Sequence, residues 1–172
     1  MKRSVIRDET NGDTEAIRRV HLEAFGGDVE ARIVDLLREA GNSIISLVAT
    51  VGAEIVGHVV FSPVAIAEAP PGFGALGLGP VGVRPGSQTM GFGSALIREG
   101  LRRCERDGYD AVFVLGSPKY YIRFGFAPAQ AFGFENEWGI GDEFMVLTLR
   151  ENARSEVHGL VRYAPAFLEA GI

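Results

Sequence analysis

A glycine-containing segment joins an apolar strand to an amphipathic helix, and it constrains the fold of this chain more than any other feature. The segment reads Gln88-Thr89-Met90-Gly91-Phe92-Gly93. A helix start leaves about four backbone N–H groups without intrahelical partners, and the helix dipole adds about half a positive charge there. Gly91 and Gly93 remove the Cβ atoms that would stand between a ligand and the backbone. The stretch Leu76–Leu101 is therefore predicted to bind a pyrophosphate through backbone N–H groups.

The spacing of the glycines excludes two better-known phosphate loops. A dinucleotide-binding fingerprint needs G-x-G-x-x-G, and Leu96 stands where the third glycine would be. A P-loop needs Gly-Lys followed by Ser or Thr, which the chain lacks. Neither nucleotide class fits.

Two motifs resemble those of the GNAT superfamily of N-acetyltransferases. Gln88, Gly91 and Gly93 match the three fixed positions of its acyl-CoA loop, which is a strand followed by Arg/Gln-x-x-Gly-x-Gly/Ala. The segment Tyr121–Phe126 resembles the Y-x-x-x-G-F segment by which the superfamily places a tyrosine beside the thioester sulfur. The pair Tyr120-Tyr121 followed by Arg-Phe-Gly-Phe is similar to a bacterial subgroup of small, single-domain acetyltransferases.

The resemblance implies acetyl-CoA as cosubstrate. The superfamily binds the pantetheine arm along a strand that splays from its neighbour, and it binds the pyrophosphate at the loop. The residues expected to bind the cofactor are Val81, Gly82, Val83, Gln88, Thr89, Met90, Gly91, Phe92, Gly93 and Ser94. No metal is expected, because the three histidines and one cysteine show no paired spacing.

Length and composition predict one cytoplasmic domain over residues 1–172. The chain is 47% hydrophobic, which suffices for one core. Met1–Thr10 has no apolar h-region, and no apolar run is long enough to span a bilayer. The single cysteine, Cys104, suits a reducing compartment and is expected in the core.

Charge argues against a nucleic-acid partner. The chain has 17 Lys and Arg against 22 Asp and Glu, a net charge of −5, and no basic stripe interleaved with aromatic residues. An acidic surface tolerates a cationic amine, although solubility alone also explains it.

Hydrophobic periodicity and turn residues predict an α/β domain with a mixed, largely antiparallel central sheet flanked by helices. The resemblance implies that this is the GNAT acyl-CoA N-acyltransferase fold. Asp13 and Asp28 are expected to cap the first two helices. Helices are expected over 13–25, 28–41, 92–106 and 118–123, strands over 43–50, 54–66, 75–83, 111–115, 143–149 and 159–163, and 127–142 stays unassigned. Pro80 cannot donate to a ladder, so the strand 75–83 should carry a bulge or an unpaired edge there.

Acetyl transfer needs a neutral amine, stabilisation of the carbonyl oxygen and help for the departing thiolate. Tyr121 is the candidate acid, because a phenol with a pKa near 10 is protonated at neutral pH and can hydrogen-bond to, or protonate, a developing thiolate with a pKa of about 8.5. The alternative is a buried aromatic residue with a satisfied hydroxyl. Tyr120 points elsewhere on the same turn and is assigned to packing. By analogy with the superfamily, backbone N–H groups of Val81–Val83 are the expected oxyanion donors.

The general base stays open. Some relatives place a glutamate on the strand 75–83, which has no ionisable residue here. Glu23, Asp142 and Glu143 are candidates, each with the alternative of a solvated surface carboxylate, and His21 and His58 are further options. Arg84 is held in reserve as a contact to the cofactor phosphates, with solvation as the alternative.

These features predict an N-acetyltransferase that transfers the acetyl group of acetyl-CoA to a primary amine by direct attack in a ternary complex. The alternative is a non-catalytic acyl-CoA-binding sensor or interaction domain that uses the strand 159–163 as an interface. The acceptor, a small molecule or a peptide, and the oligomeric state stay open, and a homodimer is common in the superfamily.

Overall fold

The computed structural model describes residues 2–151, 153 and 157–172, and these form two compact units. The first unit contains the described residues up to Ser62, Gly79–Leu101 and Pro165–Ile172. The second contains Pro63–Leu78 and the described part of Arg102–Ala164. Prediction of a single domain over the whole chain stays a prediction.

An antiparallel sheet forms the centre of the first unit. Its strands are β1 (Ser4–Asp8), β2 (Ile45–Val51), β3 (Glu54–Pro63) and the second half of β5 (Ala75–Val83). The turn Gly52-Ala53 joins β2 to β3, which pair antiparallel as a hairpin. Strand β1 pairs with β2 from Ser4↔Val51 to Asp8↔Leu47 and is not predicted by the sequence, because only Val5 and Ile6 of its five residues are apolar.

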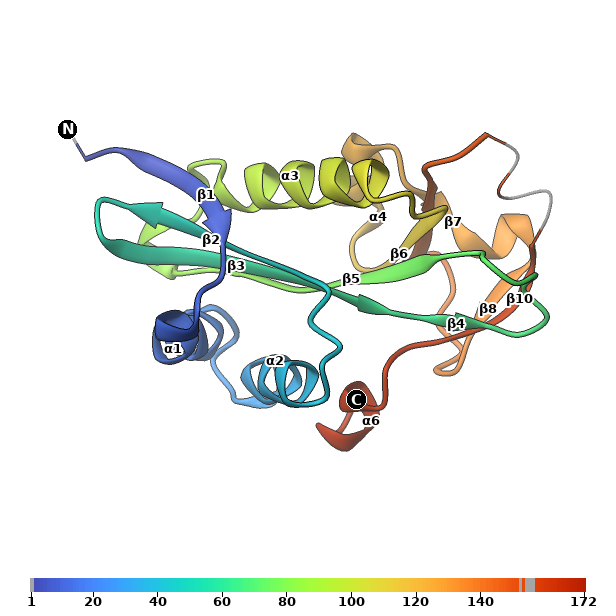
Figure 1. Ribbon diagram of the computed structural model, residues 1–172, viewed down its shortest axis with the longest axis horizontal. Coiled ribbons are helices and arrows are strands. Elements are labelled where there is room, and N and C mark those ends of the chain that lie inside the picture. The colour runs from blue at the N-terminus through green and yellow to red at the C-terminus, as the bar shows by residue number, and fades with distance from the viewer. Residues whose placement is uncertain (1, 152, 154–156) are drawn as a thin grey trace. The chain divides into compact units, whose positions relative to one another are not determined.

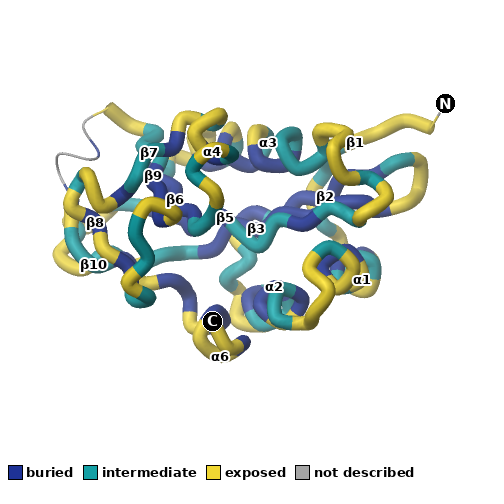
Figure 2. The backbone as a smooth tube through the Cα atoms, turned by 180° about the vertical axis from the view of Figure 1, so that it is seen from behind, coloured by how far each residue is buried: buried dark blue, intermediate teal, exposed yellow. Residues whose placement is uncertain are grey.

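Helices cover both faces of this sheet (Figure 1). Helices α1 (Thr14–Phe25) and α2 (Val29–Glu39) lie on one face, and the first part of α3 (Phe92–Arg106) lies on the other. Glycines make the approach close on both sides: a Cβ on Gly82 would meet His21 of α1 at 3.0 Å, and one on Gly57 would meet Leu96 of α3 at 3.1 Å. Figure 2 shows the buried residues running along β2 and β3 between these layers.

Asp13 and Asp28 occupy the N-cap positions of α1 and α2, but neither side chain caps its helix. The Asp13 carboxylate instead accepts hydrogen bonds from the Thr10 backbone N–H at 2.7 Å and from the Arg7 guanidinium at 2.7 Å. The prediction of side-chain caps was wrong, and for Asp13 the reason is that Arg7 and the Thr10 backbone already engage its carboxylate.

The second unit contains two sheets. The first half of β5 pairs in parallel with β6 (Ala111–Leu115), β6 pairs antiparallel with β9 (Phe144–Thr148), and β9 pairs with β7 (Ala127–Pro128). The smaller sheet has the order β4 (Ala65–Ile66), β10 (Gly159–Arg162), β8 (Phe134–Asn136). Phe113 of β6 packs on Phe134 and Phe144 with ring centroids 5.0 and 5.5 Å apart, which fills the core of this unit.

Short elements complete the chain and correct two sequence-based boundaries. The predicted strand 54–66 is divided into β3 and β4, and the unassigned region 127–142 holds β7 and β8, which are too short for a readable periodicity. The remaining elements are η1 (Asn11–Asp13), η2 (Pro85–Ser87), α4 (Pro118–Tyr121), η3 (Ile122–Phe124), η4 (Ala129–Phe132) and α6 (Ala166–Glu169). None of the helices within the described residues is both long and apolar enough to cross a membrane.

Candidate active site

The glycine segment lies at the start of α3, as predicted. The Ala95 N–H donates to the Gly91 carbonyl at 3.0 Å, which closes the first helical turn. Gly91 has φ +89° with open space where a Cβ would stand, and Thr89 also has a positive φ of 63°. Met90 is 67% exposed. The turn therefore presents its backbone to solvent at the positive end of the helix dipole, as a pyrophosphate requires.

The strand before this turn is held by the side chain of Gln88, whose Nε2 donates to the Val83 carbonyl at 3.0 Å. Pairing of β5 with β6 covers Ala75–Leu78 and stops immediately before Gly79-Pro80. The residues after Pro80 belong to the first unit, where the Arg84 N–H donates to the Val56 carbonyl of β3 at 2.8 Å. The interruption expected from proline thus coincides with the end of the β5–β6 ladder.

All of the predicted cofactor-binding residues lie in the first unit, on the second half of β5, in the turn before α3 and in the first turn of α3. They are Val81, Gly82, Val83, Gln88, Thr89, Met90, Gly91, Phe92, Gly93 and Ser94. Gly82 is buried and its two neighbours are half buried, whereas the segment from Gln88 to Gly91 is exposed. The chain therefore offers a covered strand for an extended arm and an open turn for phosphates.

Arg84 is engaged by two carboxylates. Its Nε donates to Glu23 at 2.8 Å, and its Nη1 donates to Glu54. The hydrogen bond to Glu23 raises the pKa of the guanidinium. These residues line a cleft of about 450 Å³ with Val56, Pro85, Gly86 and Ser87. Arg84 is thus neutralised locally, which weakens its assignment to cofactor phosphates, and Glu23 is partnered rather than free to act as a base.

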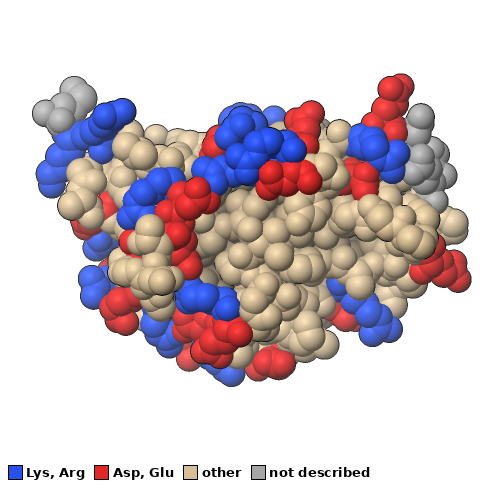
Figure 3. All heavy atoms as spheres, in the orientation of Figure 1, with Lys and Arg blue, Asp and Glu red and all other residues tan. Residues whose placement is uncertain are grey.

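Figure 3 shows acidic and basic side chains intermixed over the face that it draws.

Tyr121 lies on α4 in the second unit. It is 7% exposed, and its ring packs edge-on against Tyr120 and Phe126. A Cβ on Gly116 would lie 2.3 Å from this ring, so glycine is required there. Burial, and then the neighbouring Tyr120, raise the pKa of Tyr121 to about 12. Tyr121 therefore keeps its proton at neutral pH and can act as an acid.

The remaining base candidates of the second unit are exposed. Asp142 accepts a hydrogen bond from Gln130 at 2.9 Å, and Glu143 precedes β9. Tyr120 is half buried, with the Arg123 guanidinium 4.3 Å above its ring, in keeping with packing. Cys104 is fully buried and burial raises its pKa to about 12, so it is an unreactive core residue.

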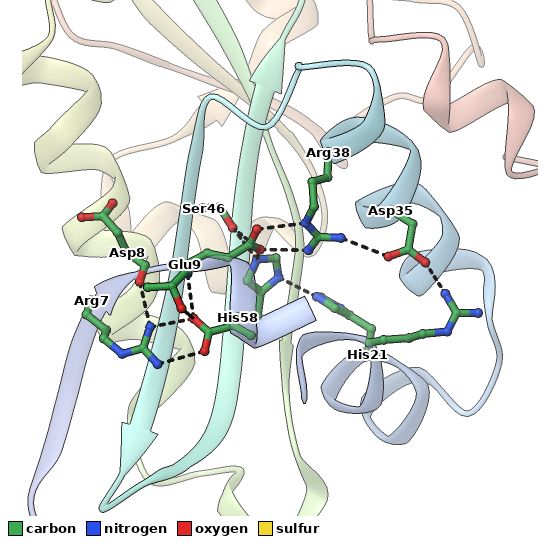
Figure 4. Close-up of polar contacts among 11 residues, drawn as sticks. Arg7, Asp8, Glu9, His21, Asp35, Arg38, Ser46 and His58 are labelled. Atoms are coloured by element: carbon green, nitrogen blue, oxygen red, sulfur yellow. Dashed lines mark hydrogen bonds and ion pairs between the residues drawn. The ribbon is translucent and has the colours of Figure 1, made fainter. Parts of the chain in front are cut away.

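The first unit contains a buried pair of histidines, His21 and His58, whose contact could not be inferred from the sequence. His21 Nε2 lies 2.8 Å from His58 Nδ1, and His58 Nε2 lies 2.7 Å from Ser46 Oγ (Figure 4). Ser46 donates to Glu9 at 3.0 Å. Both histidines are fully buried, and burial is the largest cause that lowers their pKa values, that of His21 to about 4. The only sequence signal is His58 within the apolar run of β3. Among the described residues, no group of three potential ligands could hold a metal ion.

Comparisons with known proteins agree with this architecture. The family model described as an acetyltransferase (GNAT) domain matches residues 5–129. The uncharacterised N-acetyltransferase YhbS of Escherichia coli is 34% identical over 165 residues, which is 95% of this chain and 98% of that protein. The N-acetyltransferase YjhQ of E. coli is 36% identical over 118 residues, 67% of this chain and 65% of that protein.

Two solved structures are similar over nearly the whole chain. The crystal structure of E. coli YhbS in complex with CoA has a TM-score of 0.91 and 34% identity, and the match covers 98% of this chain and 93% of that one. A GNAT family acetyltransferase from Brucella melitensis in complex with acetyl-CoA has a TM-score of 0.80 and 35% identity, with 97% and 99% covered. The chain therefore belongs to the GNAT family of acetyltransferases.

Proposed function

We propose that this protein transfers the acetyl group of acetyl-CoA to a primary amine by direct attack in a ternary complex. As a GNAT enzyme it is an acetyl-CoA-dependent N-acyltransferase, and its relatives from E. coli and B. melitensis are seen with CoA and acetyl-CoA. The observation that carries the proposal is the exposed turn at the start of α3, where Gly91 has a positive φ and open space above its backbone. A pyrophosphate can reach the helix N-terminus there.

The cofactor is placed by backbone groups in this proposal. The turn from Gln88 to Ser94 binds the pyrophosphate, and the strand Val81–Val83 binds the pantetheine arm. For the strand to offer the Val83 carbonyl to the cofactor, the exposed side chain of Gln88 exchanges its hydrogen bond for water or the ligand. Backbone N–H groups of the same strand stabilise the oxyanion as the amine attacks the thioester carbon.

The leaving group is served by Tyr121. As the C–S bond breaks, its phenol proton passes to the sulfur, and solvent later returns a proton to the phenolate. A pKa of about 12 keeps the phenol of Tyr121 protonated at neutral pH until the C–S bond breaks. The amine must attack in its neutral form. At a pKa near 10.4, about one amine in a thousand is neutral at pH 7.4, which corresponds to about 4 kcal/mol that a base can recover.

Isothermal titration with acetyl-CoA, beside free CoA and NADH, tests the cofactor assignment first. We expect acetyl-CoA and CoA to bind and NADH not to bind. A panel of amines, polyamines, amino acids and peptides, read by thiol release, then tests transfer. Binding without release for any amine would favour an acyl-CoA sensor. Absence of binding up to about millimolar, less than about 4 kcal/mol, would contradict the whole proposal.

A further inference from the structure

Four polar side chains from different elements form one continuous hydrogen-bonded path inside the first unit (Figure 4). The path runs from His21 on α1 to His58 on β3, then to Ser46 on β2 and to Glu9, which follows β1. The three contacts measure 2.8, 2.7 and 3.0 Å. Polar side chains are costly to bury, so a path of this kind within a core needs an explanation.

The Glu9 carboxylate at one end of the path determines which atom donates in each hydrogen bond along it. The Glu9 carboxylate only accepts, so the single Ser46 hydroxyl proton points to it. Ser46 Oγ must then accept from His58, which places the His58 proton on Nε2 and leaves Nδ1 as an acceptor. His21 therefore donates from Nε2 to His58, and His21 Nδ1 carries a lone pair. Burial keeps both rings neutral at pH 7, as this arrangement requires.

The free end of the path points to the strand that is proposed to bind the pantetheine arm and to stabilise the oxyanion. His21 Nδ1 is buried and has no hydrogen-bond partner among the described residues. It lies 3.0 Å from where a Cβ of Gly82 would stand, so the absence of a side chain on Gly82 lets the ring approach β5. An unpaired acceptor buried beside this strand is suited to meet a ligand proton.

The other end of the path approaches solvent. Glu9 is held by two hydrogen bonds of 2.9 Å from Arg38, which also donates to Asp35 at 3.1 Å. The side chain of Glu9 is 14% exposed, whereas that of His58 is fully buried. A proton delivered to Glu9 can therefore leave to water, and the guanidinium fixes the carboxylate that orients the whole path.

We propose that His21 Nδ1 accepts the proton released by the attacking amine and that His58, Ser46 and Glu9 carry a proton to solvent. This inference rests on the proposed function. As the C–N bond forms, the amine proton passes to His21 Nδ1. The Nε2 proton of His21 then moves to His58 Nδ1, the Nε2 proton of His58 to Ser46 Oγ, and the hydroxyl proton to Glu9. One proton leaves the amine and one leaves Glu9, so no charge stays on the buried rings. After product release the reverse transfers, from solvent at Glu9 to the emptied site at His21 Nδ1, restore the starting tautomers.

The orientation of the path can be read without catalysis, from long-range ¹H–¹⁵N spectra of the full protein with ¹⁵N-labelled histidine. We expect His21 and His58 as neutral Nε2–H tautomers, with unprotonated Nδ1 atoms. The Ser46→Ala variant should lose this uniform tautomer at His58, because the hydroxyl that accepts its Nε2 proton is removed and the Glu9 carboxylate lies 3.7 Å away, beyond hydrogen-bond distance. A His21 ring that carries its proton on Nδ1 would overturn the proposal, since the free end could not accept.

Turnover tests the transfer itself, with two variants that break the path at different points. His21→Phe keeps a ring that can stack on Phe25, and Ser46→Ala removes the hydroxyl between His58 and Glu9. We expect each to lower turnover at least tenfold with acetyl-CoA affinity unchanged within about twofold. Ser46→Thr keeps a hydroxyl and should restore most of the turnover. Ser62→Ala is the matched control, because Ser62 is a fully buried serine of β3 outside the path.

The outcomes separate this inference from the function on which it rests. If the wild type releases CoA with an amine and both path variants match Ser62→Ala, the relay is wrong and the acetyltransferase assignment stands. If the wild type releases no CoA with any amine, the proposed function fails and the relay fails with it. Should His21→Phe not fold, Ser46→Ala with its threonine rescue and the tautomer spectrum decide.

Discussion

Burial sets the protonation state of the side chains that are proposed to move protons. Tyr121 is nearly enclosed, and its pKa rises to about 12, so it stays a neutral phenol. His21 and His58 are enclosed as well, and their pKa values fall, so they stay neutral imidazoles. Desolvation disfavours whichever form of a side chain is charged. It therefore keeps Tyr121 protonated, as a proton donor, and keeps His21 and His58 neutral, as proton acceptors.

Tyr121→Phe tests the acid directly. Removing the hydroxyl should lower turnover about ten- to a thousandfold and leave acetyl-CoA affinity nearly unchanged, because the proton is needed only as the thiolate departs. Steady-state thiol release and calorimetric titration measure the two quantities. Tyr120→Phe is the control, since Tyr120 is assigned to packing. Turnover equal to that of wild type in Tyr121→Phe would remove the residue from the mechanism.

Asp13→Asn tests the ion pair between β1 and α1. The Arg7 hydrogen bond lowers the pKa of Asp13 to about 2, against the opposing effect of burial. A lowered folded-state pKa stabilises the fold above the unfolded value near 3.9 and loses this contribution as the pH falls towards 2. After allowance for the exposure of Arg7, we expect Asp13→Asn to lower the free energy of unfolding by about 1–2 kcal/mol at pH 7.

The difference between wild type and Asp13→Asn should nearly vanish at a pH of about 2, measured by urea denaturation at each pH. Asp28→Asn is the matched control, because Asp28 holds the same N-cap position on α2 without a side-chain cap. A stability difference that is constant from neutral to acidic pH would show that the charge of Asp13 is not its cause.

At the scale of elements, α3 combines an open start with a closely packed body. The turn before it, Gln88–Gly91, is exposed and its first turn is half buried, whereas Leu96, Ile97 and Gly100 are buried. The packed body fixes the axis of the helix, and the axis determines where the dipole and the first N–H groups point. The predicted phosphate site thus depends on contacts made further along the same helix.

Gly93→Val tests the phosphate site at the start of α3. A branched side chain next to the open turn should obstruct the pyrophosphate and weaken acetyl-CoA binding at least tenfold in calorimetric titration. Glu105→Val, at an exposed position in the last turn of the same helix, carries a similar β-branched penalty and should bind normally. Unchanged affinity in Gly93→Val would move the cofactor away from this turn.

Gly100→Ala tests the packing of α3 on β3. A Cβ there would lie 2.2 Å from the Phe61 ring, which is fully buried and cannot withdraw. Alanine favours helices by about 1 kcal/mol over glycine, but overpacking of this severity costs about 1–3 kcal/mol or more. We expect a net loss in the free energy of unfolding, measured in urea. Gly12→Ala, which meets nothing within 4 Å, should change it little, and a stabilised Gly100→Ala would contradict the packing.

At the scale of the whole molecule, two elements run from one compact unit into the other. Strand β5 passes between units after Leu78, and helix α3 does so after Leu101. A unit that unfolded alone would break a strand in its middle and a helix in its middle. This continuity is the reason to expect one cooperative domain over residues 1–172.

Equilibrium unfolding with two probes tests this expectation. Fluorescence of the single tryptophan, Trp138, reports on the second unit, and far-UV circular dichroism includes α1 and α2 of the first. We expect the two urea transitions to have the same midpoint. Separate midpoints would show that the units are independent domains.

Local patterns in the sequence determined the central elements of this protein. The bounds predicted for β5 and α3, Ala75–Val83 and Phe92–Arg106, are those observed, because a proline-marked apolar run and an amphipathic period are encoded within a few neighbouring residues. The loop and tyrosine motifs likewise identified the family, which the comparisons confirm.

Only the tertiary structure determined which side chains meet in the buried polar path and which strands lie at the edges of the sheets. His21 and His58 are separated by 37 positions in the chain and meet at 2.8 Å only because α1 packs on β3. Strand β1 and the carboxylate of Asp13 likewise take their roles from partners elsewhere in the fold. The side chains of a helix or a strand point outwards with a fixed period, so these elements leave a periodic trace in the sequence, whereas a buried polar side chain is satisfied by whatever the folded backbone brings near it.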